Sequence, residues 1–241
     1  VGDVKHVMVD LNKELHAVKE PWDAIRKSWL KQIDAWREER PLSYEYDEEV
    51  IKPQFVIEKL YEVTKGKAII TTEVGQNQMW AAQFYKFDEP NTFLTSGGLG
   101  TMGYGFPAAI GAQLALPDSL VVDIAGDGSI QMNIQEFGTI SHNRIPIKIA
   151  ILNNRYLGMV RQWQDLFYEK RYVGTPLSCP DFVKLAESFG VKGYRVSSED
   201  ELEPILKNAL DQNVPTIVDC PVDYSENLLL SEKLGGLICP M

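Results

Sequence analysis

The segment from Val121 to Met159 constrains the fold more than any other part of the sequence. It contains two short apolar runs rich in β-branched residues, Val121–Ala125 and Ile147–Leu152. Between them, Asn133–His142 has helix-forming character, with apolar side chains three or four residues apart. Two strands joined by a crossover helix lie parallel in one sheet. The segment therefore predicts a parallel strand–helix–strand unit.

Polar residues directly follow each of the two predicted strands of this unit. Gly126-Asp127-Gly128 follows the first strand and Asn153-Asn154 follows the second. Open α/β sheets bind ligands at the carboxyl ends of their strands, and carboxylate and amide oxygens suit a hard cation that carries a diphosphate. The alternative is a hairpin turn at Asp127-Gly128. We favour the ligand site, because Gln131–Glu136 alternates too poorly to form the second strand of a hairpin.

Length, charge and cysteine content exclude several classes of protein. A chain of 241 residues can form one sizeable core, or one domain with an extension. The formal net charge of −10 argues against nucleic-acid binding, which needs a basic surface. We also expect no membrane association, because no apolar run approaches the length of a span. Cys179, Cys220 and Cys239 are far apart and form no CxxC pair, so we expect reduced thiols in a cytoplasmic protein.

The remaining sequence predicts one sheet domain with flanking segments. Strands alternate with helices from Ala68 to Cys220, which indicates an α/β fold with a doubly wound parallel sheet and helices on both faces. We assign residues 51–221 to this domain and residues 222–241 to a C-terminal tail. Residues 1–50 are interpreted as the remnant of a preceding central domain followed by a helical linker.

The N-terminal residues have features of a segment from the middle of a longer protein. Val1–Leu15 predicts a strand and the start of a helix, which is too little for a domain. Pro21–Arg40 predicts an amphipathic helix, with Pro21 at its first position. Because the chain begins without methionine, we expect a C-terminal portion of a longer polypeptide.

Motifs around the central segment resemble a known enzyme family. Gly126-Asp127-Gly128, followed after about twenty-five residues by Asn153-Asn154, resembles the GDG…NN signature of thiamine-diphosphate enzymes. The flanking sequence resembles the catalytic (large) subunit of acetohydroxyacid synthase, also called acetolactate synthase. The segments that carry this resemblance are Val74-Gly75-Gln76, Gln78-Met79-Trp80, Ser96–Gly103, Leu157–Val160 and Gln162-Trp163. The resemblance covers most of the chain and implies the thiamine-diphosphate-binding fold.

The resemblance implies a magnesium site at the two strand exits. Asp127 and the side-chain oxygen of Asn154 would bind Mg²⁺, and the main-chain carbonyl of Tyr156 would be a third ligand. Mg²⁺ keeps water and phosphate oxygens, so a few protein ligands suffice. Gly128 and Ser129 would meet the phosphates of thiamine diphosphate through main-chain N–H groups.

The resemblance also implies contacts to the rest of the cofactor. Gly75, Gln76 and Asn77 would face the diphosphate, although Asn77 stands where the family often has histidine. Met102, close to Gly100, would hold the two rings of the cofactor in a bent shape. Without the resemblance, Asn77 reads as part of a polar turn and Met102 as a residue that fills a gap in the core.

A helix after the second strand exit would complete the pocket. Met159 and Trp163 are one helical turn apart and so share a face. The resemblance assigns them to the wall where the second 2-keto acid binds, Trp163 favouring 2-ketobutyrate, whereas without it ordinary helix packing explains them equally well. Further cofactor contacts would come from Gly126, Leu157 and Gly158.

The reaction implied by the resemblance is a carboligation. Pyruvate is decarboxylated, and its hydroxyethyl unit condenses with pyruvate or 2-ketobutyrate to give 2-acetolactate or 2-aceto-2-hydroxybutyrate, in branched-chain amino-acid biosynthesis. The activating glutamate of the family belongs to a pyrimidine-binding domain absent from this chain. We therefore expect no catalytic residue here, read Glu136 as structural, and expect the isolated chain to be inactive.

The resemblance extends to the intact enzyme. It implies a homodimer or tetramer of catalytic subunits, with which a small regulatory subunit can associate. It further implies FAD, bound mainly outside this chain, and a cytoplasmic location, or a plastid in a plant.

Other functions share part of this pattern. Val222–Asn227 is closer to catabolic acetolactate synthases, whereas Leu99–Gly103 and Arg161–Trp163 are biosynthetic in type. A 2-keto-acid decarboxylase or pyruvate oxidase would share the GDG…NN signature. A non-catalytic, flavodoxin-like module could hold a phosphate ligand at the same sheet edge.

Overall fold

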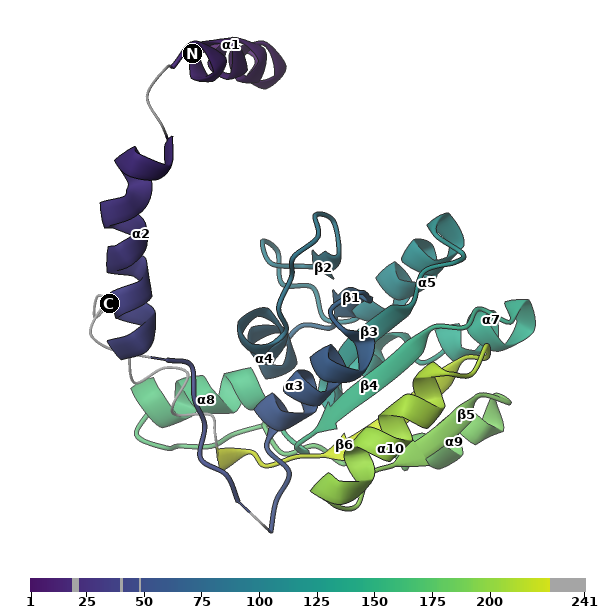
Figure 1. Ribbon diagram of the computed structural model, residues 1–241. Helices are drawn as coiled ribbons and strands as arrows, with labels where there is room; N and C mark the ends of the chain where they lie inside the picture. The colour runs from purple at the N-terminus through teal and green to yellow at the C-terminus, as the bar shows by residue number, and fades with distance from the viewer. Residues whose placement is uncertain (19–21, 40, 48, 226–241) are drawn as a thin grey trace. The chain divides into compact units, whose positions relative to one another are not determined.

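The computed structural model describes residues 1–18, 22–39, 41–47 and 49–225 (Figure 1). The chain divides into two compact units, Val1–Ser43 and Tyr44–Met241. Residues 226–241, most of the expected tail, lie outside the described residues. No helix in the described part of the chain combines the length and apolar character needed to cross a bilayer.

The first unit contains helices α1 (Val4–Ala17) and α2 (Trp22–Glu39). The strand predicted near Val1 is wrong, because the Asp3 side chain caps α1 by accepting the His6 N–H at 3.2 Å and the helix begins at once. Helix α2 lies within the predicted range Pro21–Arg40, whose two end residues lie outside the described part of the chain. The assignment of residues 1–50 to a preceding domain stays a prediction.

The second unit is a six-stranded sheet with helices between its strands. All its neighbouring strands are parallel, in the order β2-β1-β3-β4-β6-β5. The strands are β1 (Ile69–Thr72), β2 (Phe93–Thr95), β3 (Val121–Gly126), β4 (Lys148–Asn153), β5 (Lys192–Arg195) and β6 (Thr216–Pro221). The helices are α3 (Pro53–Thr64), α4 (Gln76–Phe84), α5 (Gly105–Ala115), α6 (Asp127–Ile130), η1 (Gln131–Asn133), α7 (Glu136–Asn143), α8 (Gly158–Phe167), α9 (Phe182–Ser188) and α10 (Glu199–Leu210).

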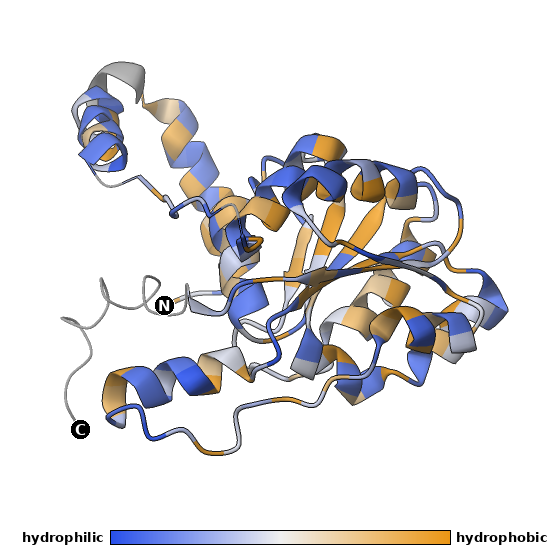
Figure 2. Cartoon of the chain, turned by 90° about the horizontal axis from the view of Figure 1, so that it is seen from below, coloured by the Kyte–Doolittle hydropathy of each residue, from blue (hydrophilic) through white to orange (hydrophobic). Residues whose placement is uncertain are grey.

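Helices cover both faces of this sheet, which confirms the predicted α/β class. On one face, α3, α4 and α10 pack on strand residues that include Ile70 and Val122. On the other face, α5, α7 and α9 pack on residues that include Ile69 and Val121. Adjacent strand residues thus point to opposite cores. Figure 2 shows the strands as a mainly apolar layer between helices with mixed apolar and polar surfaces.

The strand order places a topological switch point between β1 and β3. The chain leaves β1 toward β2 on one side and leaves β3 toward β4 on the other side (Figure 1). Ligands of doubly wound proteins bind in the crevice beyond the strand ends at such a point.

The predicted strand–helix–strand unit is present, with a different connection. Strands β3 and β4 are parallel, and Gly126 is in register with Leu152. The hairpin alternative is therefore excluded. The predicted crossover helix Asn133–His142 is instead α7, preceded by the short helices α6 and η1. The chain thus turns helical directly at Asp127, which keeps its carboxylate at the end of β3.

Candidate functional site

A cavity of about 370 Å³ lies at the carboxyl ends of β1, β3 and β4. This volume is typical of small-molecule sites. Every residue predicted to contact the cofactor, the metal or the second substrate lines it: Gly75, Gln76, Asn77, Gly100, Met102, Gly126, Asp127, Gly128, Ser129, Asn154, Tyr156, Leu157, Gly158, Met159 and Trp163. The structure therefore brings these residues together, while their individual ligand roles stay predictions.

Asp127 and Asn154 stand at the ends of neighbouring strands. Their side chains are buried, with exposed fractions of 2% and 9%. Burial raises the pKa of Asp127 to about 6, because its carboxylate loses hydration. The Asn154 amide donates through Nδ2 to Oε1 of Gln76 at 3.3 Å, and its Oδ1 accepts the main-chain N–H of Tyr156 at 3.1 Å. These two hydrogen bonds orient the Asn154 side chain.

Gln76 and Asn77 begin α4 but have different partners. Nε2 of Gln76 donates to Oε1 of Gln162 at 3.3 Å, which joins α4 to α8. Nδ2 of Asn77 donates to the main-chain oxygens of Glu73 at 2.9 Å and Ile124 at 2.8 Å. Both amide hydrogens of Asn77 are thus used to tie β1 to β3. This arrangement leaves Asn77 no side-chain hydrogen to donate to a phosphate.

Gly158 allows α8 to approach the cavity closely. A Cβ atom at this position would lie 1.9 Å from Oε1 of Gln76 and 3.1 Å from Nδ2 of Asn154. A side chain at position 158 would therefore displace the polar groups that orient Asn154.

Helix α8 also supplies the apolar wall of the cavity. Met159 and Trp163 both line it, as their spacing predicts, and Trp163 is about half exposed, at 50%. The Arg161 guanidinium lies over the rings of Tyr156 and Tyr224, at 4.1 and 4.3 Å from their centroids. These cation–π contacts hold α8 against the exit of β4 and the start of the tail.

Residues 73–220 match the family described as thiamine pyrophosphate enzyme, C-terminal TPP binding domain. The chain belongs to this family. The match begins at Glu73, directly after β1, and ends in β6, so it spans the cavity and most of the sheet.

The chain is also similar to acetolactate synthase subunits over nearly its whole length. It is 47% identical to the acetolactate synthase isozyme 3 large subunit of Escherichia coli K12, over 98% of this chain and 42% of that protein. It is 46% identical to the acetolactate synthase large subunit of Haemophilus influenzae, over 100% of this chain and 42% of that protein. Identity to the mitochondrial catalytic subunit of Saccharomyces cerevisiae is 48%, over 92% of this chain and 32% of that protein. The chain thus spans less than half the length of these relatives.

The cavity of the TPP-binding domain fits a diphosphate bound through a hard cation. No group of three or more His, Cys, Asp or Glu side chains that could hold a metal occurs among the described residues. A metal here would therefore depend on Asp127, the Asn154 amide oxygen, and main-chain or ligand oxygens, a donor set that suits Mg²⁺ with phosphate.

Trp80 lines the cavity, and its buried indole N–H has no hydrogen-bond partner within the described part of the chain. A ligand acceptor would satisfy this donor.

Cys179 contacts the predicted metal ligand, although it carries no sequence signal for this role. Its Sγ lies 3.2 Å from Oδ2 of Asp127. Burial, together with the nearby Asp127, raises the pKa of the Cys179 thiol to about 12. The protonated thiol therefore donates to the carboxylate and orients it.

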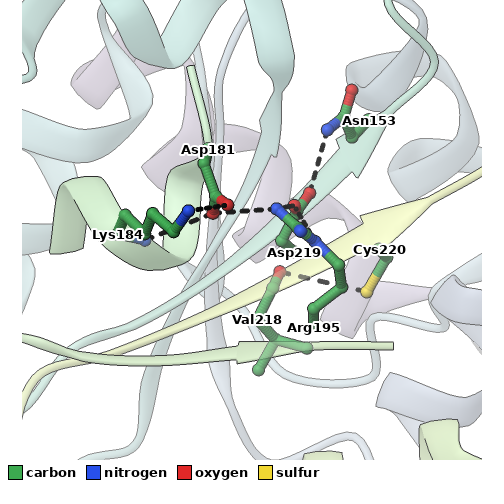
Figure 3. Close-up of polar contacts among 7 residues, drawn as sticks. All are labelled: Asn153, Asp181, Lys184, Arg195, Val218, Asp219 and Cys220. Atoms are coloured by element: carbon green, nitrogen blue, oxygen red, sulfur yellow. Dashed lines mark hydrogen bonds and ion pairs between the residues drawn. The ribbon is translucent and has the colours of Figure 1, made fainter. Parts of the chain in front are cut away.

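A polar network centred on the buried Asp219 holds the segment that carries Cys179 (Figure 3). Asp219 of β6 accepts from Nδ2 of Asn153 at 3.0 Å and from Nε of Arg195 at 3.1 Å. Nη2 of Arg195 also donates to Asp181 at 2.9 Å. Because Asp181 caps α9 just after Cys179, the network fixes this segment against the ends of β4 and β6.

Glu73 is a second residue with no sequence signal. It follows β1 in the TPP-binding domain, and its side chain is completely buried beside the cavity. It accepts hydrogen bonds from two later parts of the chain, residues 103–106 and Ser129. Only the folded chain brings these segments together.

Proposed function

We propose that this chain is the C-terminal part of the catalytic subunit of a biosynthetic acetolactate synthase. The reaction breaks the C1–C2 bond of pyruvate, releases CO₂, and forms a new C–C bond to the carbonyl carbon of a second 2-keto acid. One proton is taken up. The product is 2-acetolactate from pyruvate, or 2-aceto-2-hydroxybutyrate from 2-ketobutyrate.

The observation that carries this proposal is the similarity to acetolactate synthase large subunits over 98% of the chain. The cavity supports it, because the strand exits and the α8 wall line one space. The family match favours a thiamine pyrophosphate enzyme over a flavodoxin-like module.

In this proposal, the strand exits anchor the cofactor. Asp127, the Asn154 amide and the Tyr156 carbonyl hold Mg²⁺, and the main-chain N–H groups of Gly128 and Ser129 face the diphosphate. Thiamine diphosphate, when bound, supplies the nucleophilic carbon that accepts the two-carbon unit of pyruvate. The protein provides position and charge complementarity at this edge of the sheet.

The remaining walls orient the cofactor rings and the second substrate. Met102 would pack against the cofactor rings. Met159 and Trp163 face the second 2-keto acid, and their apolar surface favours the extra methylene of 2-ketobutyrate. One methylene in an apolar pocket contributes about 1–3 kcal/mol to discrimination.

Other components of the active enzyme lie outside this chain in our proposal. The activating glutamate belongs to a pyrimidine-binding domain, and FAD binds mainly to a central domain. Catalytic subunits form a dimer or tetramer, with which a regulatory subunit can associate. The location is the cytoplasm, or a plastid in a plant.

Product analysis of the full-length polypeptide tests this proposal. With thiamine diphosphate, Mg²⁺ and FAD, it should convert pyruvate to 2-acetolactate and, with 2-ketobutyrate added, form 2-aceto-2-hydroxybutyrate. The Asp127→Ala variant should form neither product. Acetaldehyde or acetyl phosphate as the main product would instead indicate a decarboxylase or an oxidase. This chain alone should show negligible turnover.

A further inference from the structure

Glu73 occupies a position that no sequence motif assigns. It is the first residue after β1, beside the switch point, and its side chain is 0% exposed. Its carboxylate makes no ion pair within the described residues. Its hydrogen bonds therefore indicate what it does.

Three donors from two later segments converge on the Glu73 carboxylate. Oε2 accepts the main-chain N–H of Gly103 at 2.7 Å and the hydroxyl of Ser129 at 2.6 Å. Oε1 accepts the main-chain N–H of Phe106 at 2.9 Å. Gly103 follows Met102, Phe106 lies in the first turn of α5, and Ser129 lies in α6.

The surrounding contacts close this arrangement into a network. Oγ of Ser129 also accepts the N–H groups of Val74 at 3.3 Å and Gly103 at 3.1 Å. The Gly103 carbonyl accepts from Nδ2 of Asn133 at 2.6 Å. Both polar main-chain groups of Gly103 are thus held, which fixes the turn next to Met102. Because Ser129 hydrogen-bonds inward to Glu73, its hydroxyl is directed away from a ligand.

We propose that Glu73 is a positioning residue for the cofactor site. It sets the Met102 turn, which faces the cofactor rings, against the start of α6, which faces the diphosphate. The cofactor meets both segments, so their separation decides how well it binds. This inference rests on the proposed thiamine-diphosphate function.

The test uses the full-length polypeptide with two substitutions and a matched control. Glu73→Ala removes all three acceptor contacts, whereas Glu73→Gln keeps the shape and one acceptor oxygen. The control is Thr71→Val, at a residue of β1, the strand that leads to Glu73. Thr71 does not line the cavity, and the substitution removes its buried hydrogen bond of 2.9 Å to Asp123 of β3. Calorimetry at saturating Mg²⁺ gives the Kd of thiamine diphosphate, and thermal unfolding gives the Tm of each variant.

We expect Glu73→Ala to raise the Kd on the order of tenfold or more, as for other residues that orient ligand-binding groups. Glu73→Gln should have an intermediate Kd, and Thr71→Val should lower the Tm while its Kd stays within twofold of wild type. Equal Kd values for wild type and Glu73→Gln, with only a Tm loss in Glu73→Ala, would overturn the inference. So would a rise in Kd for Thr71→Val as large as that for Glu73→Ala.

Hydrogen exchange separates this inference from the proposed function, because it needs no cofactor. In the ligand-free protein, Glu73→Ala should speed exchange at the amides of Gly103 and Phe106, Glu73→Gln should speed it at only one of them, and Thr71→Val at neither. Unchanged exchange at both amides would refute the positioning role even if the wild type binds thiamine diphosphate. Failure of the wild type to bind thiamine diphosphate would instead refute the proposed function, and the role of Glu73 at a cofactor site with it.

Discussion

Gln76 and Asn154 are separated by 78 residues in the chain, yet Nδ2 of Asn154 donates to Oε1 of Gln76 at 3.3 Å. The two residues follow β1 and β4, and β3 lies between these strands. Their hydrogen bond therefore joins the loops on either side of the strand that leads to Asp127. Gln162 extends the link to α8 by accepting from Nε2 of Gln76.

Gln162→Leu should weaken binding of thiamine diphosphate. The substitution removes the acceptor that holds Gln76 and, through it, the Asn154 amide. A hydrogen bond contributes about 1 kcal/mol, which corresponds to a roughly fivefold higher Kd. The control is Gln164→Leu, because Gln164 lies on the same helix but bonds to Val173 instead. Equal Kd values for the two variants would show that the Gln76–Gln162 contact does not orient the site.

Cys179→Ala should weaken Mg²⁺ binding, because Asp127 loses a donor that orients its carboxylate. We expect a severalfold higher Mg²⁺ concentration for half-maximal binding of thiamine diphosphate, and Cys179→Ser should restore the wild-type value. Cys220→Ala is the control, since Cys220 is buried in the sheet core. If Cys179→Ala and Cys220→Ala have the same Mg²⁺ requirement, the Cys179 thiol has no role at the metal site.

Asp123→Asn should stabilise the protein increasingly as the pH rises. Burial raises the pKa of Asp123 well above its ordinary value, and the neighbouring Glu73 adds to the effect. A carboxyl with a raised folded-state pKa holds its proton more tightly in the folded chain than in the unfolded chain. Its contribution to stability is therefore complete below pH ~4 and is lost as the pH rises toward the folded-state pKa. Asparagine mimics the neutral form and avoids this loss.

Thermal unfolding between pH 5 and pH 8 measures how Asp123→Asn changes the stability of the protein. The Tm difference between Asp123→Asn and wild type should grow with pH, by about 2–4 °C for each kcal/mol. Asp118→Asn, at an exposed turn, should show no such trend. A Tm difference for Asp123→Asn that does not change with pH would mean that Asp123 is ionised in the folded protein without cost.

The sheet and the two strand exits could be predicted because their signals are local in the sequence, whereas other cavity residues, such as Met102 and Trp163, are assigned through the family resemblance. The apolar runs of β3 and β4 end at Asp127 and at Asn153-Asn154, and parallel strands place such ends at one edge. The contacts of Glu73, Cys179 and Gln162 could not be predicted in this way. They join residues 30–86 positions apart in the chain, and no periodic pattern marks them.

The errors in the helical segments have local causes. The connection after β3 turns helical at once, whereas apolar spacing alone identifies only its last part, α7. At the N-terminus, the sequence predicts a strand and the start of a helix within Val1–Leu15. The Asp3 cap begins a helix there instead, and the described residues of that unit contain no strand to pair with.

The central claim is that Asp127 anchors thiamine diphosphate through Mg²⁺. Calorimetry of the full-length polypeptide tests it most directly, with wild type, Asp127→Ala and the exposed control Asp118→Ala, each with Mg²⁺ and with EDTA. We predict that thiamine diphosphate binds wild type and Asp118→Ala only with Mg²⁺, and that Asp127→Ala does not bind it in either condition. Binding of thiamine diphosphate to Asp127→Ala as tight as to wild type, or metal-independent binding of flavin mononucleotide in its place, would contradict the account.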